Sequence, residues 1–234
     1  MSKTKKNNPS DMKTDELAKV EGTLSKAETF IEKNRKILSY VLLGIVVIVV
    51  GIMGYNKFIK QPKEKSAYEE MFIAEYYFEV DSFNLALFGD GNYLGFLDII
   101  DEYKRTKAGN LAHYYVGMIY MHQRNFDEAI SYLKRYKSND LILSSMALGA
   151  IGDAYVEKGD IKSAVDYYYD AATNKPNAFT SPIFLMRAGW AYEELGEYKK
   201  ALDSYLTIKE KYFRTFEGRE IDKHIAKVEI KLKK

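Results

Sequence analysis

The side chains that could carry chemistry are few and scattered along the chain. The three histidines, His113, His122 and His224, form no HExxH or similar metal-binding pair, and no cysteine is present to complete a site. The segment GDGNYLG (89–95) lacks the GxGxxG spacing of a phosphate-binding loop and the alternating carboxylates of a calcium loop. We interpret it as a turn between two helices, with Asp90 or Asn92 as the N-cap.

Four carboxylates fall on predicted helices without a partnering histidine or nucleophile: Asp153, Glu157, Glu193 and Glu194. A glycosidase-like pair remains an alternative, but solvated helix faces explain these residues without chemistry. We therefore predict that the chain is not an enzyme, with no catalytic residues, no cofactor and no metal site.

Composition narrows the class of partner. Lys and Arg number 35 against 33 Asp and Glu, so no overall basic charge indicates nucleic acid, and we predict no nucleic-acid partner. The absence of cysteine excludes disulfides, thiolate zinc sites, a cysteine nucleophile and a lipid anchor on cysteine.

One apolar segment is long enough to cross a bilayer. Residues 37–56, between Lys36 and Lys57, are all uncharged, and twenty residues of helix span roughly 30 Å, the thickness of the hydrocarbon core. A cleaved signal peptide is the alternative, but the segment follows 36 mostly polar residues and no small-x-small cleavage pattern follows Gly54. We predict a retained single-span signal anchor that contacts membrane lipid.

Residues 1–36 precede this anchor as a polar tail. Its apolar residues recur with a 3-4-3-4 spacing that predicts an amphipathic juxtamembrane helix, which would lie on lipid headgroups or form a dimer or partner contact: Leu17, Val20, Leu24, Ala27 and Ile31. Within about fifteen residues of the span the basic residues tie at four on each side, whereas the whole tail holds nine Lys and Arg. We therefore predict a cytoplasmic N-terminus and a large domain on the outer side.

After the anchor, three stretches repeat the same pattern of small and aromatic residues. Their glycines, Gly117, Gly152 and Gly189, are 35 and 37 residues apart. A tyrosine follows each glycine by three residues, and an alanine and a large residue recur further on: Tyr120, Ala129 and Leu133; Tyr155, Ala164 and Tyr168; Tyr192, Ala201 and Tyr205. Small residues let paired helices approach closely, and large ones fill the space between neighbouring pairs.

On these positions the chain resembles the tetratricopeptide repeat (TPR) family. The middle copy fits best, with Gly159 in the interhelical turn and Pro176 at its end, whereas Arg124 replaces the turn glycine in the first copy and Phe213 the final proline in the third. The resemblance implies an all-α fold: a single N-terminal transmembrane helix followed by a TPR-type α-solenoid of about three to four helix pairs. We expect a linker at 57–63, a degenerate helix pair at 64–108, three repeats at 109–214 and a capping helix at 215–234.

The resemblance also implies a protein-binding groove lined by the first helix of each repeat. The family's groove positions fall on Leu111, Tyr114, Met118, Met121, His122, Met146, Val156, Ile183, Met186 and Trp190. Methionine repacks around varied apolar partners, although the degenerate pair or the cap could bury some of these side chains. The lysines and asparagines with which cytosolic co-chaperone TPR domains hold a terminal carboxylate are replaced here by Tyr114, Met118, Gly149 and Asp153.

The order of the segments is similar to that of YfgM-like proteins, ancillary subunits of the bacterial SecYEG translocon. FIEKNRK (30–36) directly precedes the anchor, and a short linker and a small TPR domain follow it. The resemblance implies a bacterial inner-membrane protein with a periplasmic TPR domain. Its implied partners are the SecYEG translocon, a membrane-anchored peptidyl-prolyl isomerase chaperone and newly secreted clients. The longer N-terminal tail departs from the family, and an envelope-assembly scaffold or a cytosol-facing adaptor remain alternatives.

Overall fold

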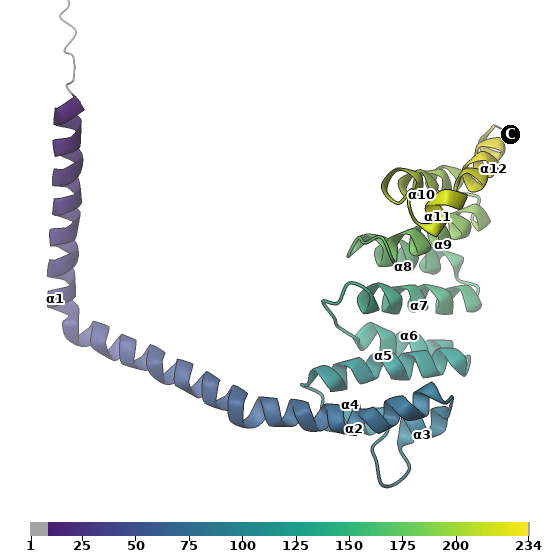
Figure 1. Ribbon diagram of the computed structural model, residues 1–234, viewed down its shortest axis with the longest axis horizontal. Helices are drawn as coiled ribbons and strands as arrows, with labels where there is room; N and C mark the ends of the chain where they lie inside the picture. The colour runs from purple at the N-terminus through teal and green to yellow at the C-terminus, as the bar shows by residue number, and fades with distance from the viewer. Residues whose placement is uncertain (1–8, 234) are drawn as a thin grey trace, which may run out of the picture. The chain divides into compact units, whose positions relative to one another are not determined.

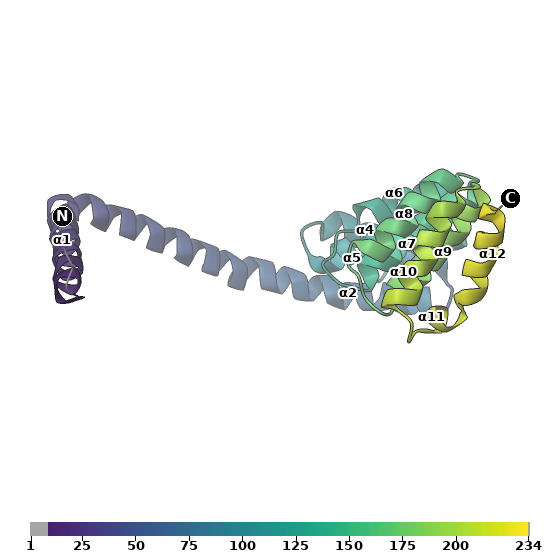
Figure 2. The same cartoon turned by 90° about the horizontal axis from the view of Figure 1, so that it is seen from above.

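The computed structural model describes residues 9–233, with side chains described from residue 29 onward (Figures 1 and 2). The chain divides into two compact units, residues 1–60 and 61–234, and the described residues are helical with no strand.

The first unit is one long helix. Helix α1 spans Pro9–Tyr55 and continues as a short π-helix, η1, at Asn56–Lys60. Its apolar stretch is exposed throughout and makes it the one described helix long and apolar enough to cross a membrane. The predicted apolar stripe from Leu17 to Ile31 lies almost entirely outside the described side chains and stays a prediction.

The second unit begins with a helical hairpin in which one long helix is followed by two short ones. Helix α2 spans Gln61–Glu79, and two short helices follow it, α3 at Phe83–Phe88 and α4 at Phe96–Glu102. The expected linker at 57–63 is therefore helical, and the expected degenerate pair contains an additional helix, α3. Asp90 accepts hydrogen bonds from the backbone N–H groups of Asn92 and Tyr93 and from the hydroxyl of Tyr77, and these bonds fix the loop between α3 and α4.

Three antiparallel helix pairs stack in order on this hairpin, as successive layers in Figure 1. The helices are α5 (Lys107–His122), α6 (Phe126–Arg135), α7 (Leu143–Glu157), α8 (Ile161–Thr173), α9 (Ser181–Glu194) and α10 (Tyr198–Lys211). The solenoid ends with α11 at Phe216–Glu220 and α12 at Asp222–Leu232, so the expected single capping helix is divided in two. Ile221, at the division, is fully buried.

The turns inside the three pairs share one backbone conformation. Arg124, Gly159 and Gly196 each have a positive φ, at 60°, 78° and 73°. Glycine adopts this left-handed conformation without steric cost, whereas a side chain pays roughly 1 kcal/mol. Arg124 therefore occupies a position where the fold prefers glycine.

Glycines also set the distance within each pair. A Cβ added at Gly117 would lie 2.5 Å from Cγ of Leu133, and one added at Gly189 would lie 2.2 Å from Cε1 of Tyr205. The equivalent distance from Gly152 to Cε1 of Tyr168 is 2.6 Å. The large side chain of each second helix therefore packs directly on the glycine of the first, which is the physical reason for the repeat.

Candidate functional site

The candidate site is the first-helix face, which we define as the exposed side of α5, α7 and α9. Tyrosines of the second helices reach toward it. Packed on Gly152, Tyr168 extends far enough for its hydroxyl to donate to Oδ1 of Asp153 at 2.6 Å, and Tyr205 donates likewise to Oε1 of Glu193 at 2.8 Å. Burial, followed by the bonded carboxylate, strongly raises the pKa of both tyrosines, so both hydroxyls stay protonated and act as donors.

Basic side chains hold the same carboxylates from the neighbouring layer. Arg187 of α9 donates to both oxygens of Asp153 at 2.5 Å, and its guanidinium lies 5.6 Å from the ring centroid of Phe184. Lys227 of α12 pairs with Glu193 at 2.7 Å. Each carboxylate therefore has a tyrosine from its own repeat and a cation from the next layer.

A third ion pair joins the first two repeats. Arg124, in the strained turn, bonds Glu157 at 2.9 Å and lies 5.5 Å from the ring centroid of Phe126. Between this pair and the Asp153–Arg187 pair is a hollow of about 350 Å³, lined by Met121, Arg124, Phe126, Asp153, Val156, Glu157, Tyr168 and Arg187. The hollow carries two positive and two negative side chains with apolar walls.

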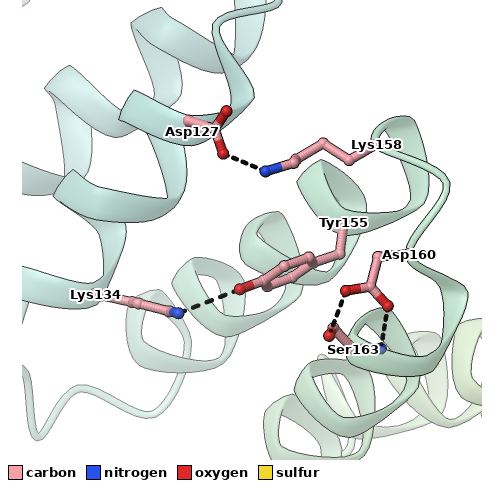
Figure 3. Close-up of polar contacts among 6 residues, drawn as sticks. All are labelled: Asp127, Lys134, Tyr155, Lys158, Asp160 and Ser163. Carbon is pink, nitrogen blue, oxygen red and sulfur yellow. Dashed lines mark hydrogen bonds and ion pairs between the residues drawn. The ribbon is translucent and has the colours of Figure 1, made fainter.

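A separate polar cluster also joins the first repeat to the second (Figure 3). Lys158, directly after α7, pairs with Asp127 of α6, and Lys134 of α6 donates to the hydroxyl of Tyr155 at 3.3 Å. The ammonium of Lys134 lies 5.6 Å from the ring of Tyr155, which stacks on the ring of Tyr167. These contacts fix α6 against α7 and, with it, the spacing of the first-helix face.

The structure places the ten predicted groove residues in three different environments. Met146, Val156 and Trp190 are exposed, Trp190 to 50%, and they are the apolar members of this set that can meet a partner without rearrangement; His122 is exposed as well. Tyr114, Met118 and Met121 are half-buried and pack against the core between the first two repeats, and Leu111 packs against the core of the N-terminal hairpin. His122 stacks on Phe83 of α3, and Ile183 is half-buried.

Met186 is a correction to the predicted groove. Its side chain is only 6% exposed and belongs to the core cluster that contains Ile221 and Ile225 of the C-terminal cap. Helix α11 packs against α9, and the cap closes this end of the solenoid. This first-helix position is interior in the last repeat, as it is in the middle repeat, where Gly149 is buried under Phe184.

Sequence reasoning missed two residues of the site, Arg124 and Arg187. Arg124 was noted only as an unusual turn residue, and Arg187 bonds a carboxylate 34 positions away in another repeat. The signal for Arg124 was its place at a glycine position. No spacing pattern in the sequence links Arg187 to Asp153.

The described residues contain no group of three or more histidine, cysteine, aspartate or glutamate side chains that could hold a metal ion. Among the described residues, each carboxylate that lines the hollow is paired with an arginine. The arrangement is suited to noncovalent recognition.

Comparison with known protein families agrees with this geometry. The family model described as tetratricopeptide repeat matches residues 96–140 and 150–212, which cover α4 to α6 and most of α7 through α10. No curated protein matches the chain. The fold is thus a TPR-type α-solenoid that follows one N-terminal apolar helix, and the repeats indicate a protein-interaction module.

Proposed function

We propose that this protein is a non-enzymatic, membrane-anchored module whose first-helix face binds a segment of a partner protein. The observation that carries the proposal is the hollow between the repeats, with exposed Met146, Val156 and Trp190 on the same helices. Exposed aromatic side chains on rigid helices bury a large apolar area, and flexible methionine side chains repack around varied partners. A partner segment with apolar side chains is the chemistry that this face fits.

The paired charges of the hollow give the face directional contacts. Arg124 and Arg187 each have guanidinium N–H groups beyond those that bind Glu157 and Asp153. Such donors bind backbone carbonyls or a carboxylate of an extended segment, while Glu157 accepts from its N–H groups. Because the four charges cancel, the face selects for hydrogen-bonding geometry rather than for net charge.

The setting we propose is the bacterial inner membrane, with the N-terminus in the cytoplasm and the solenoid in the periplasm. There the protein would act as an ancillary SecYEG subunit that assists newly secreted chains together with a membrane-anchored peptidyl-prolyl isomerase chaperone. Support comes from the apolar helix that precedes the solenoid, the basic tail before that helix, and the segment order shared with YfgM-like proteins.

The test is purification of the tagged full-length protein from native membranes in a gentle detergent, with mass spectrometry of the co-purifying proteins. We expect a SecY-type subunit and an envelope isomerase. Recovery of envelope-assembly proteins instead would replace the translocon role with a scaffold role. Recovery of cytosolic proteins alone would reverse the topology and leave the adaptor alternative.

Topology can be measured independently because the natural chain has no cysteine. Ile230, exposed on α12, provides a labelling position as Ile230→Cys. A membrane-impermeant maleimide should label this variant in intact spheroplasts. Labelling only after lysis would place the solenoid in the cytoplasm.

A further inference from the structure

The N-terminal end of the solenoid carries an unpartnered aromatic face. Helix α2 buries Ala67, Met71 and Ala74 against the rest of its unit. On the opposite side, Tyr68, Phe72 and Tyr76 are exposed to 44%, 68% and 55%. We call this exposed side the α2 stripe and include in it Lys65 and Glu79, which the helical repeat places on the same side.

The other end of the solenoid is built differently. Helix α12 buries Ile225 and Val228 and exposes mainly charged residues, with Ile230 and Leu232 as its exposed apolar side chains and no exposed aromatic ring. The α2 stripe exposes two tyrosines and a phenylalanine at the equivalent place. Because this end of the solenoid exposes aromatic side chains, we expect it to contact another surface.

The order of side chains along the stripe is self-complementary. Tyr68 and Tyr76 lie four residues on either side of Phe72, and Lys65 and Glu79 lie seven residues on either side. At about 100° and 1.5 Å per residue, all five project within roughly 40° of one direction, at heights of about 6 Å and 10 Å from Phe72. Reversing the helix thus exchanges the tyrosines with each other and the lysine with the glutamate.

We propose that the α2 stripe binds the α2 stripe of a second copy of this chain, antiparallel and centred on Phe72. A twofold axis through the two Phe72 rings brings each tyrosine to the height of the other copy's tyrosine. Lys65 of each copy then meets Glu79 of the other. This is the self-complementarity that an isologous twofold interface demands.

Charge disfavours two other arrangements. A parallel, in-register pair would set Lys65 against Lys65 and Glu79 against Glu79, which is repulsive at both ends. An anionic lipid surface is also disfavoured, since α2 carries five glutamates and two lysines. In the single chain Lys65 pairs with Glu69 at 3.5 Å, with both side chains largely exposed. Such a surface pair is worth little and is readily exchanged.

The area available predicts a weak, reversible dimer. One helical stripe buries less than the roughly 800 Å² per partner of a standard interface. Two copies held in one membrane meet at a higher effective concentration than free domains do. Crosslinking in membranes is therefore the measurement suited to this contact.

The experiment uses single-cysteine variants of the full-length protein, oxidised in native membranes and separated without reductant. Phe72→Cys should form a disulfide dimer, because the axis passes through this position. Lys65→Cys alone and Glu79→Cys alone should not, because each pair of equivalent residues is about 21 Å apart, far beyond disulfide reach. Co-expression of Lys65→Cys with Glu79→Cys should restore the crosslink. Ile230→Cys gives the background from random collision.

Two patterns would overturn the proposal. Crosslinking of Lys65→Cys with itself would indicate a parallel pair, and crosslinking of all variants at the Ile230→Cys level would mean that the stripe binds lipid or another protein, or nothing. Charge reversal adds a second readout on the Phe72→Cys dimer. Lys65→Glu should reduce its yield several-fold, and Lys65→Glu with Glu79→Lys should recover it. Both changes are on exposed positions, so circular dichroism should show an unchanged helix content.

Discussion

The first repeat and the two that follow use the same backbone for different surfaces. In the second and third repeats, Tyr168 and Tyr205 pack on a glycine and bond a carboxylate of the first helix. In the first repeat Leu133 occupies that place. The first-helix face therefore lacks this tyrosine–carboxylate bond near α5, where half-buried Tyr114, Met118 and Met121 lie. On α7 and α9 the bond is present beside the exposed apolar side chains of Met146, Val156 and Trp190.

One position of the second helix, a leucine in the first repeat and a tyrosine in the other two, therefore controls which polar groups the face presents. A tyrosine there brings a buried donor to the first helix, and a carboxylate must lie beside it to accept the bond. Leucine makes no such demand. A change at this single position would therefore add or remove a tyrosine-bonded carboxylate on the face.

The largest effect should come from the glycines under these residues. Gly189→Ala would place a methyl group against the rigid ring of Tyr205, whereas Gly117→Ala meets Cγ and Cδ2 of Leu133, an aliphatic side chain that changes rotamer more readily than a ring. Overpacking against a ring that must shift costs about 3 kcal/mol or more, and alanine returns about 1 kcal/mol of helix propensity. Gly189→Ala should lower the melting temperature of the full-length protein in detergent by several degrees, and Gly117→Ala by clearly less. Equal losses would refute the stated difference between the repeats.

Removing one tyrosine hydroxyl should have an intermediate effect. Tyr168→Phe keeps the packing on Gly152 and leaves Asp153 with Arg187 alone, so the free energy of unfolding should fall by about 1–2 kcal/mol. Tyr169→Phe, at the adjacent and exposed position of the same helix, is the matched control. If both variants unfold alike in thermal scans, the Tyr168 bond contributes nothing specific.

A smaller effect of opposite sign is expected at the first turn. Arg124→Gly relieves the left-handed strain and should stabilise the protein by up to about 1 kcal/mol, offset in part by the lost exposed pair with Glu157. Gly159→Arg, at the equivalent turn of the second repeat, should destabilise it. A lower melting temperature for Arg124→Gly would show that Arg124 contributes more through its contacts than its backbone costs.

The smallest effect concerns His113, also in the first repeat. Burial, and then the nearby Arg135, lowers the pKa of His113, and its Nδ1 is buried with no hydrogen-bond partner within the described residues. A lowered pKa in the folded state means that the unfolded chain binds the proton more readily, so stability falls as the pH drops below about 6.5. His113→Gln should lose less melting temperature than the natural chain between pH 7.5 and 5.5. His122→Gln serves as the control, and an unchanged pH response of His113→Gln would contradict this account.

Much of the fold could be predicted because the repeat pattern is carried by residues that lie close together in the sequence. Glycine, alanine and large side chains at fixed spacing identified the solenoid, since each repeat packs with the same contacts. Helix α3 was missed because six residues are too short for a periodic pattern. The cap was predicted as one helix because Ile221 continues its apolar stripe, although the chain divides there.

The candidate site was less predictable because it depends on neighbouring layers. Met186 has the spacing of a groove residue, but it belongs to a core cluster that the last two repeats share with the cap. The bond from Arg187 to Asp153 crosses between repeats, and no local pattern encodes it. Trp190 has the position of a groove residue and is exposed, but the ring of His224 from the cap lies 6.0 Å from its ring, a neighbour that its own repeat does not encode.

The central claim is that the first-helix face binds the partner, and one variant tests it most directly. Met146→Ser, Val156→Ser and Trp190→Ser together remove the exposed apolar side chains and leave buried Met186 intact. A control with Phe213→Ser and Ile230→Ser removes exposed apolar side chains outside this face. The quantity to measure is the amount of co-purified partner per tagged protein, at equal membrane insertion and helix content. We predict at least a tenfold loss for the triple variant and none for the control; undiminished partner recovery with the triple variant would contradict the account.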